Sequence, residues 1–103
     1  MFPRKRRISR SFLSLLRQKR KKTFSTGLFL VTVFESSTVP AASFSVSKKT
    51  EKEAVMRNKM RRWGYEAAKG ALFLHPVLFV YKKKPKDFGE VKMGVEEFFK
   101  RGV

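Results

Sequence analysis

The sequence predicts an α+β domain in which helices pack on one small mixed sheet, in the order helix, two or three strands, helix, strand, helix. Three segments carry apolar side chains at helical spacing, and the stretches between them are rich in Phe and Val. The chain has 103 residues, of which 42% are hydrophobic. That is enough apolar material for one small core, so we expect a single domain over residues 1–103.

A short amphipathic helix is predicted over residues 9–18. Phe12, Leu15 and Leu16 recur at positions i, i+3 and i+4, while the basic residues around them fall on other sides. A helix of this length is unstable alone in water. Its apolar side should therefore pack on the rest of the domain.

Two strands should follow this helix. Residues 24–34 are dense in Phe, Leu, Val and Thr, and residues 42–48 alternate Phe and Val with Ser. The alternation places three serines on one face of the second strand. Residues 35–41, between the two runs, are short enough to form a hairpin loop.

A central helix is predicted from a capping box at residues 50–53 to about Lys69, with Gly70 as its stop. Its apolar side, which suits packing on a sheet, consists of Met56, Met60, Trp63 and Ala67. The opposite arc consists of Arg57, Asn58, Arg61, Arg62 and Tyr65. Forked guanidinium donors suit phosphate groups, although a solvated basic face is the plain alternative.

A last strand and a last helix complete the order. Residues 77–83 form a strand by composition, and the Asp-led pattern at residues 87–90 can cap a helix. Val91, Val95 and Phe98 then follow at positions i, i+4 and i+7. The C-terminal segment is therefore an amphipathic helix.

Composition narrows the function. With 25 Lys and Arg against 8 Asp and Glu, the net charge is +17, which favours a polyanionic partner. The chain has no Cys and one His, which excludes disulfides, the usual zinc sites, a thiol nucleophile and a Ser/His/Asp triad. No run approaches the roughly 20 apolar residues of a membrane span. The basic first third leaves open a membrane-active or imported precursor with a secretory signal or a mitochondrial presequence.

The most specific pattern runs from the second strand into the central helix. Residues 44–49 read Phe-Ser-Val-Ser-Lys-Lys, and residues 54–62 read Ala-Val-Met-Arg-Asn-Lys-Met-Arg-Arg. This resembles the protein subunit of bacterial ribonuclease P, whose signature is a strand ending in two basic residues and then Ala-Val-x-Arg-Asn-Arg-x-Lys-Arg on a helix. The flanks also agree with that family, so the resemblance covers nearly the whole chain.

The chain departs from the family pattern at several positions. Lys59 stands where the family has Arg, Arg61 where it usually has Lys, and Tyr65 where another Arg is common. The loop at residues 50–53 is one residue longer than usual and lacks a Gly, whereas Gly64 inside the helix costs about 1 kcal/mol. We interpret the chain as a short, divergent member.

The resemblance implies a ribonuclease P protein-like fold, also described as ribosomal S5 domain 2-like, and a role in endonucleolytic 5′ maturation of tRNA in the bacterial cytoplasm. It implies that the RNA subunit performs the hydrolysis, with Mg²⁺ bound mainly by RNA and no catalytic or metal-binding residue in the protein. The implied partners are the catalytic RNA and precursor tRNA, with no membrane and no small-molecule substrate. A small ribosomal-type or general basic RNA-binding protein without a role in tRNA cleavage is the alternative.

The resemblance also implies two sets of site residues. In the family the signature helix, connected through an unusual left-handed crossover, contacts the catalytic RNA, and the single-stranded 5′ leader lies between the first helix and the sheet. The expected contacts with the catalytic RNA are Lys48, Lys49, Arg57, Asn58, Lys59, Arg61 and Arg62. The expected leader cleft is lined by Phe12, Leu16, Phe24, Phe29, Ser45 and Ser47. Phe at strand spacing equally fits a core, so which sheet face is buried stays open.

Overall fold

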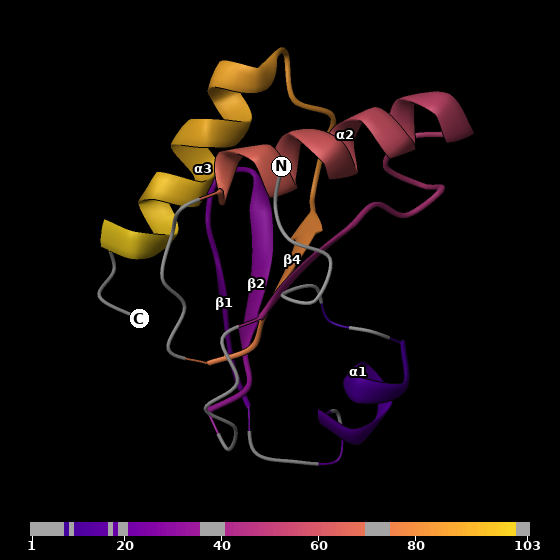
Figure 1. Cartoon of the computed structure of the whole chain (residues 1–103). Helices are drawn as coiled ribbons and strands as arrows, with labels where there is room; N and C mark the ends of the chain where they lie inside the picture. The colour runs from indigo at the N-terminus through magenta and orange to yellow at the C-terminus, as the bar shows by residue number, and fades with distance from the viewer. Residues whose placement is uncertain are drawn as a thin grey trace.

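The computed structural model describes residues 8, 10–16, 18, 21–35, 41–69 and 75–100. Within these residues the chain forms three helices and four strands, in the order that Figure 1 shows. The elements are α1 (Arg10–Leu16), β1 (Lys22–Ser25), β2 (Phe29–Val33), β3 (Ala42–Ser45), α2 (Ala54–Ala67), β4 (Val77–Tyr81) and α3 (Phe88–Lys100). The predicted α+β class and element order are confirmed, with three strands between the first two helices.

The four strands form one mixed sheet in the spatial order β1-β2-β4-β3. β1 and β2, and likewise β2 and β4, are antiparallel, whereas β3 and β4 are parallel. Parallel neighbours need a crossover connection, which α2 provides. Because β4 lies between β2 and β3, residues 35–41 do not join neighbouring strands, and the predicted hairpin loop there is wrong.

The hairpin lies earlier in the chain, inside the run predicted as one strand over residues 24–34. Thr26 closes it, because its hydroxyl accepts the Phe29 amide at 3.0 Å and its own amide donates to the Phe29 carbonyl at 2.8 Å. Gly27 and Leu28 form the tip between the two strands. The single Gly marks the turn, but the Phe-rich residues around it obscured that signal.

The two long helices bury one face of the sheet. Figure 1 shows α2 and α3 lying together, apart from α1. Phe79 of β4 stacks on Phe44 of β3 with ring centres 4.6 Å apart, and Phe98 of α3 meets Phe79 edge-on at 5.3 Å. The expected apolar side of the central helix is confirmed in this core: Met60 is buried, and Met56, Trp63 and Ala67 are half-buried against it.

Two helical glycines set how closely these helices approach the sheet. A Cβ at Gly64 of α2 would overlap three ring carbons of Phe44, and a Cβ at Gly94 of α3 would lie 2.8 Å from the Phe29 ring. Both glycines are buried. Gly64, which the sequence presents only as a helix-weakening residue, is thus the contact point between α2 and β3.

The helix α1 covers part of the opposite face with Phe12 and Leu16 of its expected apolar side, whereas Leu15, expected on the same side, is 60% exposed. Leu16 is buried there against Leu78 of β4 and Phe34, and the partly buried side chains around them are Ile8, Phe12, Leu13 and Val80. The rest of this face is exposed or half-buried. We call it the open face: Thr23, Ser25, Leu30, Thr32, Ser43, Ser45 and Val80.

The two predicted helix caps have different outcomes. Glu53 is the N-cap of α2 and makes no side-chain capping bond, so the capping box at residues 50–53 is wrong. At α3 the Asp-led pattern is confirmed, because Asp87 Oδ1 accepts the Glu90 amide at 3.0 Å. Gly70, the expected stop of α2, lies outside the described residues; α2 ends at Ala67.

Candidate functional site

The side of α2 that faces away from the core is basic. Asn58, Lys59 and Arg62 are exposed, and Arg61 is half-buried and donates a hydrogen bond to Asn58 Oδ1. The Lys59 amine lies 5.1 Å from the centre of the Trp63 ring, close enough for a cation–π contact. Forked and single cationic donors therefore stand along one stretch of helix, where they can bind anions.

Tyr65 does not continue the basic arc, although the helical wheel places it there. Its ring meets Phe44 edge-on with the centres 5.2 Å apart, and its hydroxyl accepts the Phe44 amide at 3.5 Å. The aromatic residue at this position therefore packs on β3. The basic arc of α2 ends at Arg61 and Arg62.

Arg57 points back toward the chain that precedes α2. Its Nη1 donates to the carbonyl oxygen of Glu51 at 3.0 Å and to that of Lys52 at 2.7 Å. The side chain is half-buried. The first arginine of the signature thus differs from its exposed neighbours, because part of its guanidinium is already bound.

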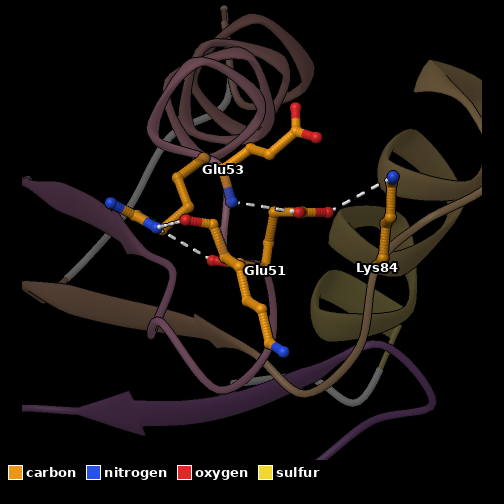
Figure 2. A network of polar contacts seen from close by, with 5 residues as sticks. Glu51, Glu53 and Lys84 are labelled. Carbon is orange, nitrogen blue, oxygen red and sulfur yellow. Dashed lines mark hydrogen bonds and ion pairs between the residues drawn. The ribbon is translucent and has the colours of Figure 1, made fainter.

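Glu51 ties the same loop to the segment after β4 (Figure 2). One carboxylate oxygen accepts the Glu53 amide at 3.2 Å, and the other lies 3.2 Å from the Lys84 amine. The Glu53 amide, and then Lys84, hold the pKa of the Glu51 carboxyl below its usual value, because both stabilise the charged form. The Glu51 side chain is only 12% exposed, so its negative charge is balanced by contacts within the protein.

Lys48 and Lys49 lie in a turn and not at a strand end, since β3 stops at Ser45. Both are exposed. Ser47 begins the turn, and its hydroxyl lies 3.1 Å from that of Thr50 and accepts the Thr50 amide at 3.2 Å. The two lysines are thus carried by a hydrogen-bonded turn just before α2.

The residues expected to line the leader cleft divide between the two sheet faces. Phe29 has no exposed surface and lies in the core under α2 and α3. Phe24 pairs with Val31 across the hairpin, faces the same side, and stacks on Phe98 at 5.8 Å. Neither ring lies on the sheet face that α1 partly covers. The expectation that Phe24 and Phe29 line one surface with Phe12 is therefore wrong.

The other four expected residues lie on or beside the face that α1 shares. Ser45 is exposed on the open face, and Phe12 is half-buried at its border. Leu16 is 2% exposed, so its role is to hold α1 on the sheet. Ser47 lies beyond the strand, in the turn that carries the lysines. Only Phe12 and Ser45 therefore stand where a ligand on the open face could reach them.

The sequence reasoning missed the main residues of the open face. Leu30, which is 42% exposed, and Thr32 alternate along β2 with buried Phe29 and Val31. Val80 lies beside Leu30 across the strand pair. Burial alternates along β2, but the sequence does not show this alternation, because exposed Leu30 is as apolar as its buried neighbours.

Two absences can be stated for the described part of the chain. It contains no group of three His, Cys, Asp or Glu side chains that could hold a metal ion. Its helices include none that is long and apolar enough to cross a membrane.

Comparison with known proteins identifies the chain's relatives. None of the curated proteins compared with it matches significantly. The solved structures that match include three of the Staphylococcus aureus RNase P protein. One is 17% identical to this chain, with a TM-score of 0.69 and 91% of each chain covered. The second, a mutant described as defective in mRNA degradation activity, is 18% identical, with a TM-score of 0.73 and coverage of 95% of this chain and 88% of that one. The third is 18% identical, with a TM-score of 0.72 and coverage of 98% of this chain and 92% of that one. These likenesses show the fold. A family model for Ribonuclease P matches residues 2–101, and the chain, with its signature residues on the exposed side of α2, therefore belongs to the ribonuclease P protein family.

Proposed function

We propose that this ribonuclease P protein component binds the catalytic RNA and the 5′ leader of precursor tRNA, and so promotes endonucleolytic removal of the leader. The observation that carries the proposal is the family match over residues 2–101, because it includes the signature helix, the sheet and α1. The net charge of +17 supports an RNA partner, since each phosphate neutralised by Lys or Arg releases condensed counterions.

The proposed surface for the catalytic RNA is the basic side of α2 with the turn before it. Asn58, Lys59 and Arg62 are exposed on the helix, and Lys48 and Lys49 are exposed on the turn. Arg61 supports the surface by orienting the Asn58 side chain. Guanidinium forks and amines at this spacing fit the phosphates of a folded RNA.

The proposed surface for the leader is the open face beside α1. It offers half-exposed apolar groups such as Leu30, small hydroxyls such as Thr32 and Ser45, and the ring of Phe12 at its border. Apolar patches for bases next to hydroxyls for the sugar-phosphate chain suit a single strand with little sequence preference.

We propose that the RNA subunit supplies the chemistry and holds the Mg²⁺ ions. A surface that carries Lys48, Lys49 and Arg62 repels divalent cations, so ions at the boundary would lie on the phosphate side. The protein contribution is then positioning of the substrate, which brings the scissile phosphate to the ions that the RNA holds.

The test is cleavage of precursor tRNA by the cognate ribonuclease P RNA at low Mg²⁺, with and without the protein, on long-leader and leaderless substrates. We expect the protein to rescue cleavage, and to do so mainly for the long-leader substrate. Rescue equal for both substrates would contradict the leader role. No rescue despite tight RNA binding would leave a general basic RNA-binding protein and overturn the proposed function.

A further inference from the structure

The orientation of Arg57 distinguishes it from the other basic residues of α2. Its Nη1 bridges two successive carbonyl oxygens, those of Glu51 and Lys52, at 3.0 and 2.7 Å. A charged donor shared by two adjacent carbonyls fixes the peptide unit between them, because rotation of either carbonyl breaks a bond. Arg57 therefore acts on the backbone of the loop that precedes its own helix.

This loop has few other connections to α2. Glu53, the N-cap, makes no side-chain bond to the helix, and the backbone link is the Arg57 amide, which donates to the Glu53 carbonyl at 2.9 Å. The loop's other bonds lie within the loop and the turn before it, or run to other elements. The Thr50 hydroxyl donates to the Tyr81 carbonyl at 3.4 Å, and Glu51 pairs with Lys84. The Arg57 side chain thus supplies the attachment to α2 that a capping side chain would otherwise give.

The loop carries amines next to the basic side of α2. Lys48, Lys49 and Lys52 are all exposed, and they precede Asn58 and Arg62 of the helix by six to fourteen residues. Their position relative to the helix depends on the conformation of residues 50–53. A loop fixed in advance presents these amines to an RNA without loss of conformational entropy on binding.

We infer that Arg57 is a positioning residue, which holds the loop of residues 50–53 against α2 so that Lys48, Lys49 and Lys52 form one surface with Asn58 and Arg62. The inference deepens the proposed function, on which its RNA-binding consequence rests. It replaces the expectation that Arg57 contacts the catalytic RNA in the same way as Arg62. A guanidinium that turned to a phosphate with both amino groups would have to release the two carbonyls, and the bond to the Glu51 carbonyl is partly buried.

The first experiment uses the free protein and needs no RNA. Hydrogen exchange is followed at the amides of Thr50, Glu51 and Glu53, which are hydrogen-bonded in the loop. Arg57→Gln should accelerate their exchange about tenfold or more, since bonds from a charged donor are lost. Arg57→Lys, which keeps the charge but not the fork, should give a smaller acceleration and serves if the Gln variant does not fold. The matched control Arg62→Gln should leave exchange unchanged.

The second experiment is a double-mutant cycle on binding to the cognate catalytic RNA. The cycle compares the loss of RNA affinity that Lys49→Gln causes in the wild type with the loss that it causes in the Arg57→Gln variant. If Arg57 positions the loop, the loss in the Arg57→Gln variant should be smaller by about threefold or more. The same cycle with Arg62 should be additive, because Arg62 acts by itself. Additive effects for Arg57, or loop exchange that Arg57→Gln and Arg57→Lys leave unchanged, would overturn the inference. Wild-type binding no tighter than to an unrelated RNA would instead refute the proposed function, and the exchange rates would still decide whether Arg57 holds the loop.

Discussion

At the scale of single residues, Gly64 shows how one missing side chain sets the distance between a helix and a sheet. A methyl group there would overlap the Phe44 ring, which is itself stacked on Phe79 at 4.6 Å and cannot retreat into a void. Gly94 has the same relation to Phe29 on α3. In both helices, a glycine is therefore the point of closest approach to the sheet.

Gly64→Ala should destabilise the protein although Ala is the better helix former. The propensity gain is about 1 kcal/mol, whereas inserting a methyl group into a packed core costs about 1–3 kcal/mol and here displaces an aromatic ring. We expect a net loss of at least about 1 kcal/mol in the free energy of unfolding, measured by urea denaturation followed by circular dichroism. The control is Gly27→Ala, which has no atom within 4 Å of the added methyl and should change stability little. A stabilised Gly64→Ala variant would mean that α2 does not approach β3 so closely.

Tyr81 should make the protein sensitive to alkaline pH. Burial raises the pKa of its hydroxyl, which donates to the Met60 carbonyl at 2.7 Å. Below a pH of about 10, where an unfolded Tyr begins to ionise, this stabilisation is complete. Above it the unfolded state releases a proton that the folded state keeps, so stability falls by up to about 1.4 kcal/mol per pH unit.

The measurement is urea denaturation of the wild type and of Tyr81→Phe between pH 8 and pH 11. At neutral pH, the free energy of unfolding of the variant should be about 1 kcal/mol lower than that of the wild type, because the hydrogen bond to Met60 is absent. Its further loss above pH 10 should be smaller than that of the wild type, since only the wild type carries this titrating group. Parallel curves for the two proteins would show that Tyr81 ionises normally in the folded state.

At the scale of elements, the sequence predicted what depends on periodicity and missed what depends on pairing. The three helices were found because apolar residues repeat at helical spacing, and the cap at Asp87 because its partner is local. The split of residues 24–34 into β1 and β2, and the place of β4 between β2 and β3, follow from long-range pairing. Such contacts leave little trace in local sequence.

In the candidate site, too, features that depend on helical periodicity were predictable, whereas features that depend on long-range contacts were not. The basic side of α2 was predictable, because a helical wheel fixes which side chains are neighbours. The orientation of Arg57 toward the loop was not, since it depends on the path of residues 51–53. Of the residues expected in the leader cleft, Phe29 lies in the core and Phe24 packs against it, which depends on a strand register that the sequence does not show.

The open face gives a prediction about this element of the site. Leu30→Glu should weaken binding of a long-leader precursor tRNA to the holoenzyme severalfold, because a carboxylate among exposed side chains repels the leader phosphates. Leu30 is 42% exposed, so the fold should tolerate the change. Binding of a leaderless substrate should not change.

Met93→Glu is the matched control for this prediction. Met93 is 70% exposed on α3 and lies outside both proposed surfaces, and the variant adds the same charge. We expect its affinity for the long-leader substrate to equal that of the wild type, with both variants folded by circular dichroism. Equal losses in Leu30→Glu and Met93→Glu would show that the open face has no special contact with the leader.

At the scale of the whole molecule, the charge is large but unevenly placed. Four of the eight acidic residues lie on or just before α3, and their positions are 87, 90, 96 and 97. The exposed part of α2 carries Lys59 and Arg62, and the one acidic residue of this helix, Glu66, pairs with Lys69. Glu51 nearby is paired with Lys84. The field of the protein should therefore orient an RNA toward α2 and its preceding turn and away from α3.

Two variants with the same net charge test this orientation. Arg62→Gln on α2 and Lys92→Gln on α3 each remove one positive charge from an exposed side chain, which lowers the formal charge from +17 to +16. If attraction depended on net charge alone, both would weaken binding to the catalytic RNA equally. If Arg62 contacts a phosphate, its variant alone should reduce the slope of log affinity against log salt concentration by about 0.7 to 0.9, the value for one contact.

The binding constants are measured from low to high salt, because affinity at a single salt concentration mixes general attraction with specific contacts. Lys92→Gln should give a line parallel to that of the wild type, since an exposed charge more than a Debye length of about 10 Å from the RNA is screened. Equal slopes for Arg62→Gln and the wild type would place Arg62 outside the interface. A reduced slope for Lys92→Gln would bring α3 into contact with the RNA, and the basic side of α2 would then be only one part of a surface that surrounds the protein.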